Sequence, residues 1–149
     1  MSTLSFFLVA CLLAPAPSHG DAEVGLCDCN SLSTSEAFER ATLVFTGRVV
    51  RGEFSTDETE RLIGYGGVRY WLDVEEVFKG DVQDMVEVRG GPGGMCFYNF
   101  SVSLRYVVFT HRARSQGGDV QLVSMCLPTA QLDQSEETET LRHLRSRRP

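Results

Sequence analysis

Five segments of the chain show the alternation of apolar and polar residues that is typical of β-strands. They are rich in Val, Tyr, Phe and Leu, and clusters of Gly, Asp and Ser separate them, as expected for short strands joined by turns. The segments cover residues 43–54, 67–80, 84–91, 103–112 and 118–126. The pattern predicts a chain that is mainly β.

Two of these segments carry further detail. In the second, alternate residues from Val68 to Val74 are apolar, which predicts a half-buried strand. Glu75 and Glu76 then interrupt the alternation, so a β-bulge is expected there, with both acids solvated. The fourth segment is apolar on both faces and is expected to be covered on both sides. The stretch "ARSQGGDV", residues 113–120, predicts a hairpin into the fifth segment.

A helix is expected before the strands. Ser33 and Glu36 have the spacing of a capping box, in which each side chain bonds the backbone of the other residue. Glu36 also lies one turn before Arg40, where opposite charges attract. The pattern predicts a short helix from Thr34 to about Thr42.

A second helix is expected after the strands, where acidic residues come first and basic residues last. Asp133 and Glu136 have the spacing of another capping box. The apolar stripe of this segment is thin, so marginal packing is expected; it consists of Leu132, Leu141 and Leu144. Residues 146–149 are expected to form a disordered tail.

Five strands with one helix before them and one after, in about 130 residues, favour a small closed barrel of the OB kind. A β-sandwich would need seven or more strands. We therefore expect a mainly β fold, an OB-like five-stranded barrel with a short N-terminal helix, a C-terminal helix and two disulfides. The domain is expected to span residues 27–145.

The first residues resemble a secretory leader. Residues 4–13 form an apolar run that is too short to span a bilayer, and small residues follow it. A signal peptide of residues 1–20 is expected, with cleavage after Gly20 or after Ala22, and the mature protein is expected to be extracellular. As an alternative, "LVAC" resembles a bacterial lipoprotein box, in which Cys11 would carry a lipid and anchor the chain to a membrane.

Composition limits the class of partner. The chain has 149 residues, of which 42% are apolar and 23% charged, as in a soluble protein of one domain. Its net charge of -6 argues against nucleic-acid binding, which requires a cationic surface. The expected partner is another protein, bound by a monomer of this chain.

Four cysteines remain after the leader, and an even number in an oxidising compartment predicts two disulfides. Of the three pairings that are open, a bridge from Cys27 to Cys29 is disfavoured because a one-residue loop strains its geometry. A structural zinc site is also disfavoured, because Cys96 and Cys126 stand alone rather than in a close pair.

The sequence offers little for catalysis. His111 is the only histidine outside the leader and the tail, it lies near no nucleophile motif, and it is expected to be exposed in a hairpin. No enzymatic activity and no cofactor are expected. Asn99 begins the triplet Asn-Phe-Ser, a possible glycosylation site.

Several features together resemble the netrin-type (NTR) module, and within that group the N-terminal domain of the tissue inhibitors of metalloproteinases. They are "CDC" at 27–29, "SEAFERATLVFTGRVV" at 35–50, "YWLDVEEVFKGD" at 70–81, a cysteine before "SLRYVVF" at 103–109, and a cysteine at the end of the last strand. The resemblance covers about Cys27 to Leu144. It implies an OB-like barrel and the disulfides Cys27–Cys96 and Cys29–Cys126.

The resemblance also implies a mechanism. In those inhibitors the first cysteine is the mature N-terminus, and its free α-amine and carbonyl chelate the catalytic zinc of the protease, displacing the attacking water. This role would fall to Cys27 after a further cut behind Leu26, and Asp28 would point into the S1′ pocket of the protease. The implied inhibitory ridge comprises Asp28, Cys29, Asn30, Ser31 and Met95.

These observations favour a secreted metalloendopeptidase inhibitor whose partner is an extracellular zinc metalloprotease. The alternative is an NTR module that begins at Asp21 or Glu23 and binds another extracellular protein without inhibiting proteases. A third possibility is a bacterial envelope lipoprotein on the same module, held at the membrane through Cys11.

Overall fold

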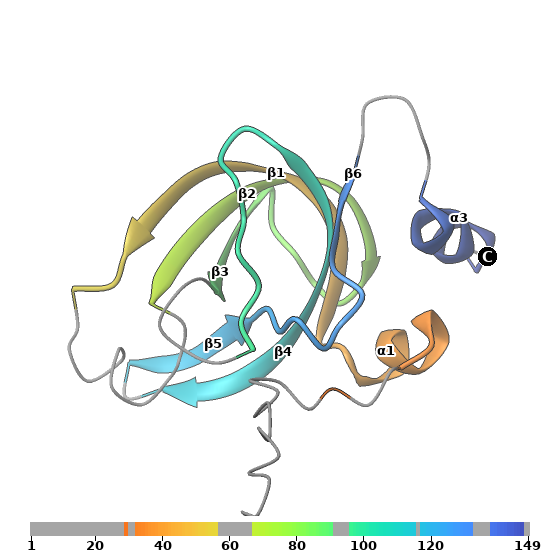
Figure 1. Ribbon diagram of the computed structural model, residues 1–149, viewed down its shortest axis with the longest axis horizontal. Coiled ribbons are helices and arrows are strands. Elements are labelled where there is room, and N and C mark those ends of the chain that lie inside the picture. The colour runs from red at the N-terminus through yellow and green to blue at the C-terminus, as the bar shows by residue number, and fades with distance from the viewer. Residues whose placement is uncertain are drawn as a thin grey trace, which may run out of the picture.

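The computed structural model describes residues 29, 32–56, 67–90, 96–115, 117–132 and 138–147. Strands make up most of the described chain, with a helix at each end, as the sequence predicts (Figure 1). The elements are α1 (Thr34–Arg40), β1 (Leu43–Phe54), β2 (Val68–Lys79), β3 (Met85–Gly90), β4 (Arg105–Ser115), β5 (Gly118–Leu122), β6 (Ala130–Leu132) and α3 (Glu139–Ser146).

Five of the strands pair in a closed ring. The order is β1-β2-β3-β5-β4, and β4 pairs again with β1 (Figure 1). The pairings are antiparallel except that of β3 with β5, which is parallel and consists of the single register pair Arg89 and Leu122. The hairpin expected between the fourth and fifth strands is present. The first strand, β1, and the last, β6, therefore both pair with β4.

The bulge predicted in the second strand is confirmed. Between β1 and β2 the register passes from Glu76 opposite Thr46 to Val74 opposite Gly47, so Glu75 is the extra residue. A bulge increases the local twist and bends the strand. Two further register shifts add Phe78 to β2 and Val50 to β1, so both strands can curve around the ring.

The ring encloses the first of two apolar cores. The face of β2 that was predicted to be buried points into it, with Leu72 fully buried and Val68 and Tyr70 nearly so. The other buried members are Leu43, Phe45, Val49, Val88, Phe100, Tyr106, Val108 and Val123. The interior of the ring is therefore filled by side chains.

The second core lies outside the ring, under the two helices (Figure 1). Val107 and Phe109 of β4 belong to it, whereas Tyr106 and Val108 belong to the first core. The prediction that this strand is covered on both sides is thus confirmed. The other members of the second core are Ala37, Ala41, Val44, Leu132, Leu141 and Leu144. The leucine stripe predicted for one helix is divided: Leu141 and Leu144 lie on α3, whereas Leu132 lies in β6 and joins the same core from there.

The capping box of α1 is present. The Ser33 hydroxyl accepts the Glu36 N–H at 3.3 Å, and Glu36 accepts the Ser33 N–H at 2.9 Å. The Ser33 hydroxyl also donates to the Glu36 carboxylate at 2.7 Å, and this bond, together with the one from the Ser33 N–H, lowers the pKa of the Glu36 carboxyl. At the other end of the helix, the Lys79 ammonium donates to the carbonyls of Phe38 and Glu39 at 2.7 and 2.8 Å. Strand β2 thereby supplies a cation to the C-terminus of α1, where the macrodipole favours one.

Helix α3 differs from its prediction at both ends. Its N-cap is Thr138, whose hydroxyl accepts the Leu141 N–H at 3.2 Å, while the expected cap at Asp133 and Glu136 lies outside the described residues. The helix continues through Ser146, so its last turn reaches into the segment expected to be a tail.

The paired acids on β2 were predicted to be solvated; Glu75 is exposed and Glu76 is half-buried, and each pairs with an arginine. Arg105 Nε donates to both carboxylate oxygens of Glu75 at 2.9 Å, and Arg145 of α3 pairs with Glu76 at 2.9 Å. The bulge places two consecutive acids within reach of two different arginines. One of these pairs attaches α3 to the ring.

Candidate functional site

A disulfide joins Cys29 to Cys126, with 5.1 Å between the two Cα atoms. The two residues are 97 apart in sequence. Because Cys29 precedes α1 and Cys126 follows β5, the bridge fixes the segment before the first helix against the far end of the strand region. This is one of the two bridges that the sequence resemblance implied.

The chain segments that contain Cys96 and Cys126 lie side by side. We call them the cysteine platform and define it as residues 96–98 and 123–126. The two segments pair antiparallel through an isolated bridge between Phe97 and Ser124. The Met125 N–H donates to the Cys96 carbonyl at 2.8 Å, and the Tyr98 N–H donates to the Val123 carbonyl at 2.9 Å. Cys96 and Cys126 therefore lie on neighbouring segments of the same platform.

Cys96 is itself disulfide-bonded, and its partner lies outside the described residues, because Cys29 and Cys126 are joined to each other. Its backbone has a φ of 82°, in the left-handed region that disfavours residues with a Cβ. Such a conformation persists where the surroundings fix it. Here the Cys96 backbone is fixed by the hydrogen bond from the Met125 N–H, and its side chain is fixed by the disulfide.

The platform packs closely against the strands, through a glycine of β3 and a group of aromatic side chains. A Cβ at Gly90 would lie 2.3 Å from the Tyr98 carbonyl oxygen, so only glycine allows β3 and the platform to approach this closely. The Tyr98 ring packs on Phe100 and Tyr106, with centroids 4.9 and 6.0 Å away. Burial raises the pKa of the Tyr98 phenol. Tyr98 thus connects the platform to the first core.

Of the implied inhibitory ridge, the structure describes Cys29 alone. The remaining ridge residues lie outside the described part of the chain, and so does the predicted zinc ligand Cys27; these ridge residues are Asp28, Asn30, Ser31 and Met95. The predictions of a leader and of a lipid on Cys11 lie outside it as well.

Met125 belongs to the platform and was missed in the sequence. Its side chain is 60% exposed beside the Cys29–Cys126 bridge. The sequence predicted a strand through residue 126. Strand β5 instead ends at Leu122, and the Ser124 hydroxyl accepts the Cys126 N–H at 3.1 Å. This local bond turns the chain and leaves Met125 in solvent.

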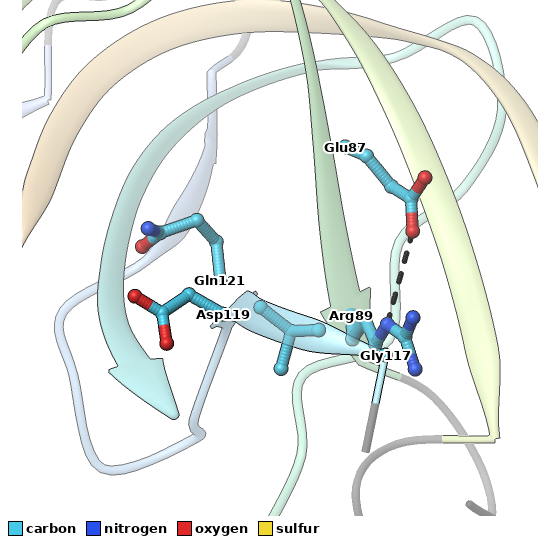
Figure 2. A pocket seen from close by; sticks show the side chains of 6 residues that line it. Glu87, Arg89, Gly117, Asp119 and Gln121 are labelled. Carbon is cyan, nitrogen blue, oxygen red and sulfur yellow. Dashed lines mark ion pairs between the residues drawn. The ribbon is translucent and has the colours of Figure 1, made fainter. Parts of the chain in front are cut away.

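A small polar hollow of about 250 Å³ lies between β3 and β5. Figure 2 shows Glu87 and Arg89 on one side of it and Asp119 and Gln121 on the other. Glu87 and Arg89 form an ion pair at 3.7 Å, and Asp119 pairs with Arg112 at the same distance. The described lining consists of Glu87, Arg89, Gly117, Asp119, Val120 and Gln121.

His111 lies within β4 opposite Leu122 and is half-buried, which corrects the prediction of an exposed hairpin histidine. Burial lowers the pKa of its imidazole. His111 lies in the hairpin of β4 and β5, outside the platform. Asn99, by contrast, is exposed one residue beyond the platform.

No protein-family model matches this chain, and a comparison with curated proteins finds no match. The described residues contain no cluster of three or more metal-binding side chains. Within the same residues, no helix combines the length and the apolar character needed to cross a bilayer. The description of the platform therefore rests on its disulfide and its hydrogen bonds.

Proposed function

We propose that this chain is a secreted inhibitor of extracellular zinc metalloproteases that acts through the residues around Cys27. The observation that carries the proposal is the Cys29–Cys126 bridge, because it holds the N-terminal segment against the cysteine platform. A protease inhibitor must present a short segment in one conformation, and a covalent anchor reduces the entropy lost when that segment binds.

The fold proposed for the inhibitor is an OB-like barrel of the netrin type. The closed order β1-β2-β3-β5-β4 supports it, together with the parallel contact of β3 and β5 and the bulges between β1 and β2. The interior packed with side chains is what a small closed barrel requires. In this arrangement the platform lies at one edge, where strands end and loops can contact a partner.

The second bridge of the proposal joins Cys27 to Cys96. It is supported by the disulfide state of Cys96 and by the position of Cys96 beside Cys126 on the platform. With Cys29 attached to one segment of the platform and Cys27 to the other, the "CDC" triplet would be held at both of its cysteines. Asp28 between them would then project toward the partner.

The inhibitory step would belong to the backbone of Cys27. Once Cys27 is the first residue, its neutral α-amine and its carbonyl oxygen would coordinate the zinc of the protease in place of the attacking water. Asp28 would enter the pocket for the residue that follows the scissile bond. The exposed Met125 would extend the contact surface beyond the ridge expected from the sequence.

The test compares two forms of the secreted protein that differ only before Cys27. One begins at Cys27, and the other carries one added alanine, whose amide replaces the α-amine. We expect inhibition of a panel of extracellular zinc metalloproteases by the first form and at least a hundredfold weaker inhibition by the second. Equal inhibition by both forms would contradict zinc chelation by the amine.

The added alanine needs a control for folding. Both forms should show the same thermal unfolding and the same disulfide content, because the addition lies outside the described fold. If neither form inhibits any protease and both are folded, the alternative stands. The chain is then an extracellular binding module, which agrees with a leader that ends at Gly20 or Ala22 and leaves residues ahead of Cys27.

A further inference from the structure

Asn99 is displayed to solvent by the residues on either side of it. Tyr98 is half-buried and Phe100 is only 7% exposed, whereas Asn99 between them is exposed. The Phe100 ring lies 5.1 Å from that of Tyr70 and 4.9 Å from that of Tyr106, centroid to centroid. Two anchored aromatic residues thus force the asparagine side chain outward.

The rest of the Asn-Phe-Ser triplet is also fixed and accessible. Ser101 is exposed, and its backbone N–H donates to the Tyr106 hydroxyl at 3.0 Å. A tight turn begins there: the Leu104 N–H donates to the Ser101 carbonyl at 3.4 Å, and Ser103 has a φ of 73°. The asparagine and the hydroxyl residue that define a glycosylation triplet are therefore both on the surface.

The turn that follows exposes apolar side chains. Val102 is 51% exposed and Leu104 is 38% exposed. Backbone hydrogen bonds hold this turn beside β1. The Ser103 N–H donates to the Val49 carbonyl at 2.7 Å, and the Val49 N–H donates to the Leu104 carbonyl at 3.0 Å. We call Val102 and Leu104 the apolar turn. It begins three residues after Asn99.

We propose that Asn99 carries an N-linked oligosaccharide and that this oligosaccharide covers the apolar turn. Transfer from a lipid pyrophosphate-linked oligosaccharide forms a bond from Asn99 Nδ2 to C1 of the first sugar. The bond from C1 to the pyrophosphate oxygen breaks, the lipid pyrophosphate leaves with the bonding electrons, and the amide loses one proton. The proposal shares with the proposed inhibitor only the secretory route.

An apolar turn this close to a glycosylation triplet gives the sugar a physical role. Exposed valine and leucine side chains favour association with other apolar surfaces, and a glycan is bulky and solubilising. Asn99 and Val102 are three residues apart, about 10 Å at most along the chain, so the first sugars lie within reach of the turn. The glycan would keep this edge of the ring from self-association.

The first experiment secretes the full chain from eukaryotic cells and measures intact mass before and after treatment with a peptide N-glycosidase. One glycan is expected on the wild type and on Ser101→Thr, which keeps the hydroxyl, and none on Asn99→Gln or Ser101→Ala. Ser103→Gly is the control outside the triplet and should keep the glycan. A folded, secreted wild type with unmodified Asn99 overturns the proposal.

The second experiment tests the covering role. Asn99→Gln should self-associate at lower concentration than the glycosylated wild type in analytical ultracentrifugation, and adding Val102→Ser to it should restore the monomer. If glycosylated and unglycosylated proteins associate equally, the glycan does not cover the turn. Inhibition measured on the same samples separates the two proposals, because Asn99 lies outside the implied ridge and loss of its glycan should leave inhibition unchanged.

Discussion

Removal of the Cys29–Cys126 bridge is the most informative perturbation of the fold. We consider the double variant Cys29→Ala and Cys126→Ala, which removes the cross-link without leaving a free thiol at either position. The bridge spans 97 residues. In the chain-entropy account a lone cross-link of this span would contribute about 4.7 kcal/mol; with Cys96 already bridged inside the same loop, the contribution is about 4 kcal/mol, because less of the unfolded chain remains to be restricted.

That magnitude is a large part of the total stability of a small domain, which is about 5–15 kcal/mol. At about 4 °C per kcal/mol for a domain of this size, the melting temperature should fall by about 15–20 °C. The measurement is thermal and urea unfolding followed by circular dichroism on the double variant and on the wild type. Met125→Ala is the control beside the bridge, and its exposed side chain predicts a change within about 0.5 kcal/mol.

The reasoning would be refuted if the double variant lost less than about 1 kcal/mol relative to the wild type. That result would mean that the Cys29–Cys126 bridge restricts the unfolded chain very little. A loss equally large in Met125→Ala would also contradict it, since it would assign the effect to packing of the platform rather than to the cross-link.

Three further predictions follow from the cores and the titrating groups. Leu144→Ala should cost about 2–4 kcal/mol in urea unfolding because Leu144 is 2% exposed in the second core, whereas the same truncation at exposed Leu104 should cost less than about 1 kcal/mol. Gly90→Ala should destabilise by about 1–3 kcal/mol, since its Cβ would meet the Tyr98 carbonyl at 2.3 Å; an unchanged urea midpoint would contradict the close approach. His111 should titrate by NMR below its ordinary pKa of about 6.5. The unfolded state then binds the proton more readily, so stability should fall as pH drops below 6.5, and His111→Gln should abolish that dependence.

Local signals in the sequence were sufficient for most elements. The capping box gave the start of α1, and the alternation of side chains gave β1 to β3 almost to the residue. The interruption at Glu75 gave the bulge. Each of these depends on neighbours within a few positions, where residue identity determines backbone and burial directly.

Features set by distant parts of the chain were missed. Strand β6 has three residues and gains its place by pairing with β4, which no local period reveals. The leucine stripe of the predicted helix suggested marginal packing, but Leu132 lies in β6. Leu141 and Leu144 of α3 meet partners from α1, β1, β4 and β6 in the second core. The two arginines that pair with the acids of the bulge are likewise separated from them by 30 and 69 residues.

The site was predictable in its covalent anchor and not in its surface. Four cysteines alone left three pairings open, and the resemblance selected the one that contains Cys29–Cys126, which is present. The neighbourhood of Cys96 and Cys126 depends on backbone pairing between residues 96–98 and 123–126. The exposure of Met125 depends on where β5 ends, and the sequence predicted a strand that runs on through residue 126.

N-terminal sequencing combined with disulfide mapping of the secreted protein tests the central claim most directly. The account predicts Cys27 as the first residue, in a peptide linked to the peptide that contains Cys96, with Cys29 linked to Cys126. A mature chain that begins at Asp21 or Glu23 would contradict it, because the nitrogen of Cys27 would then be an amide and unable to coordinate zinc.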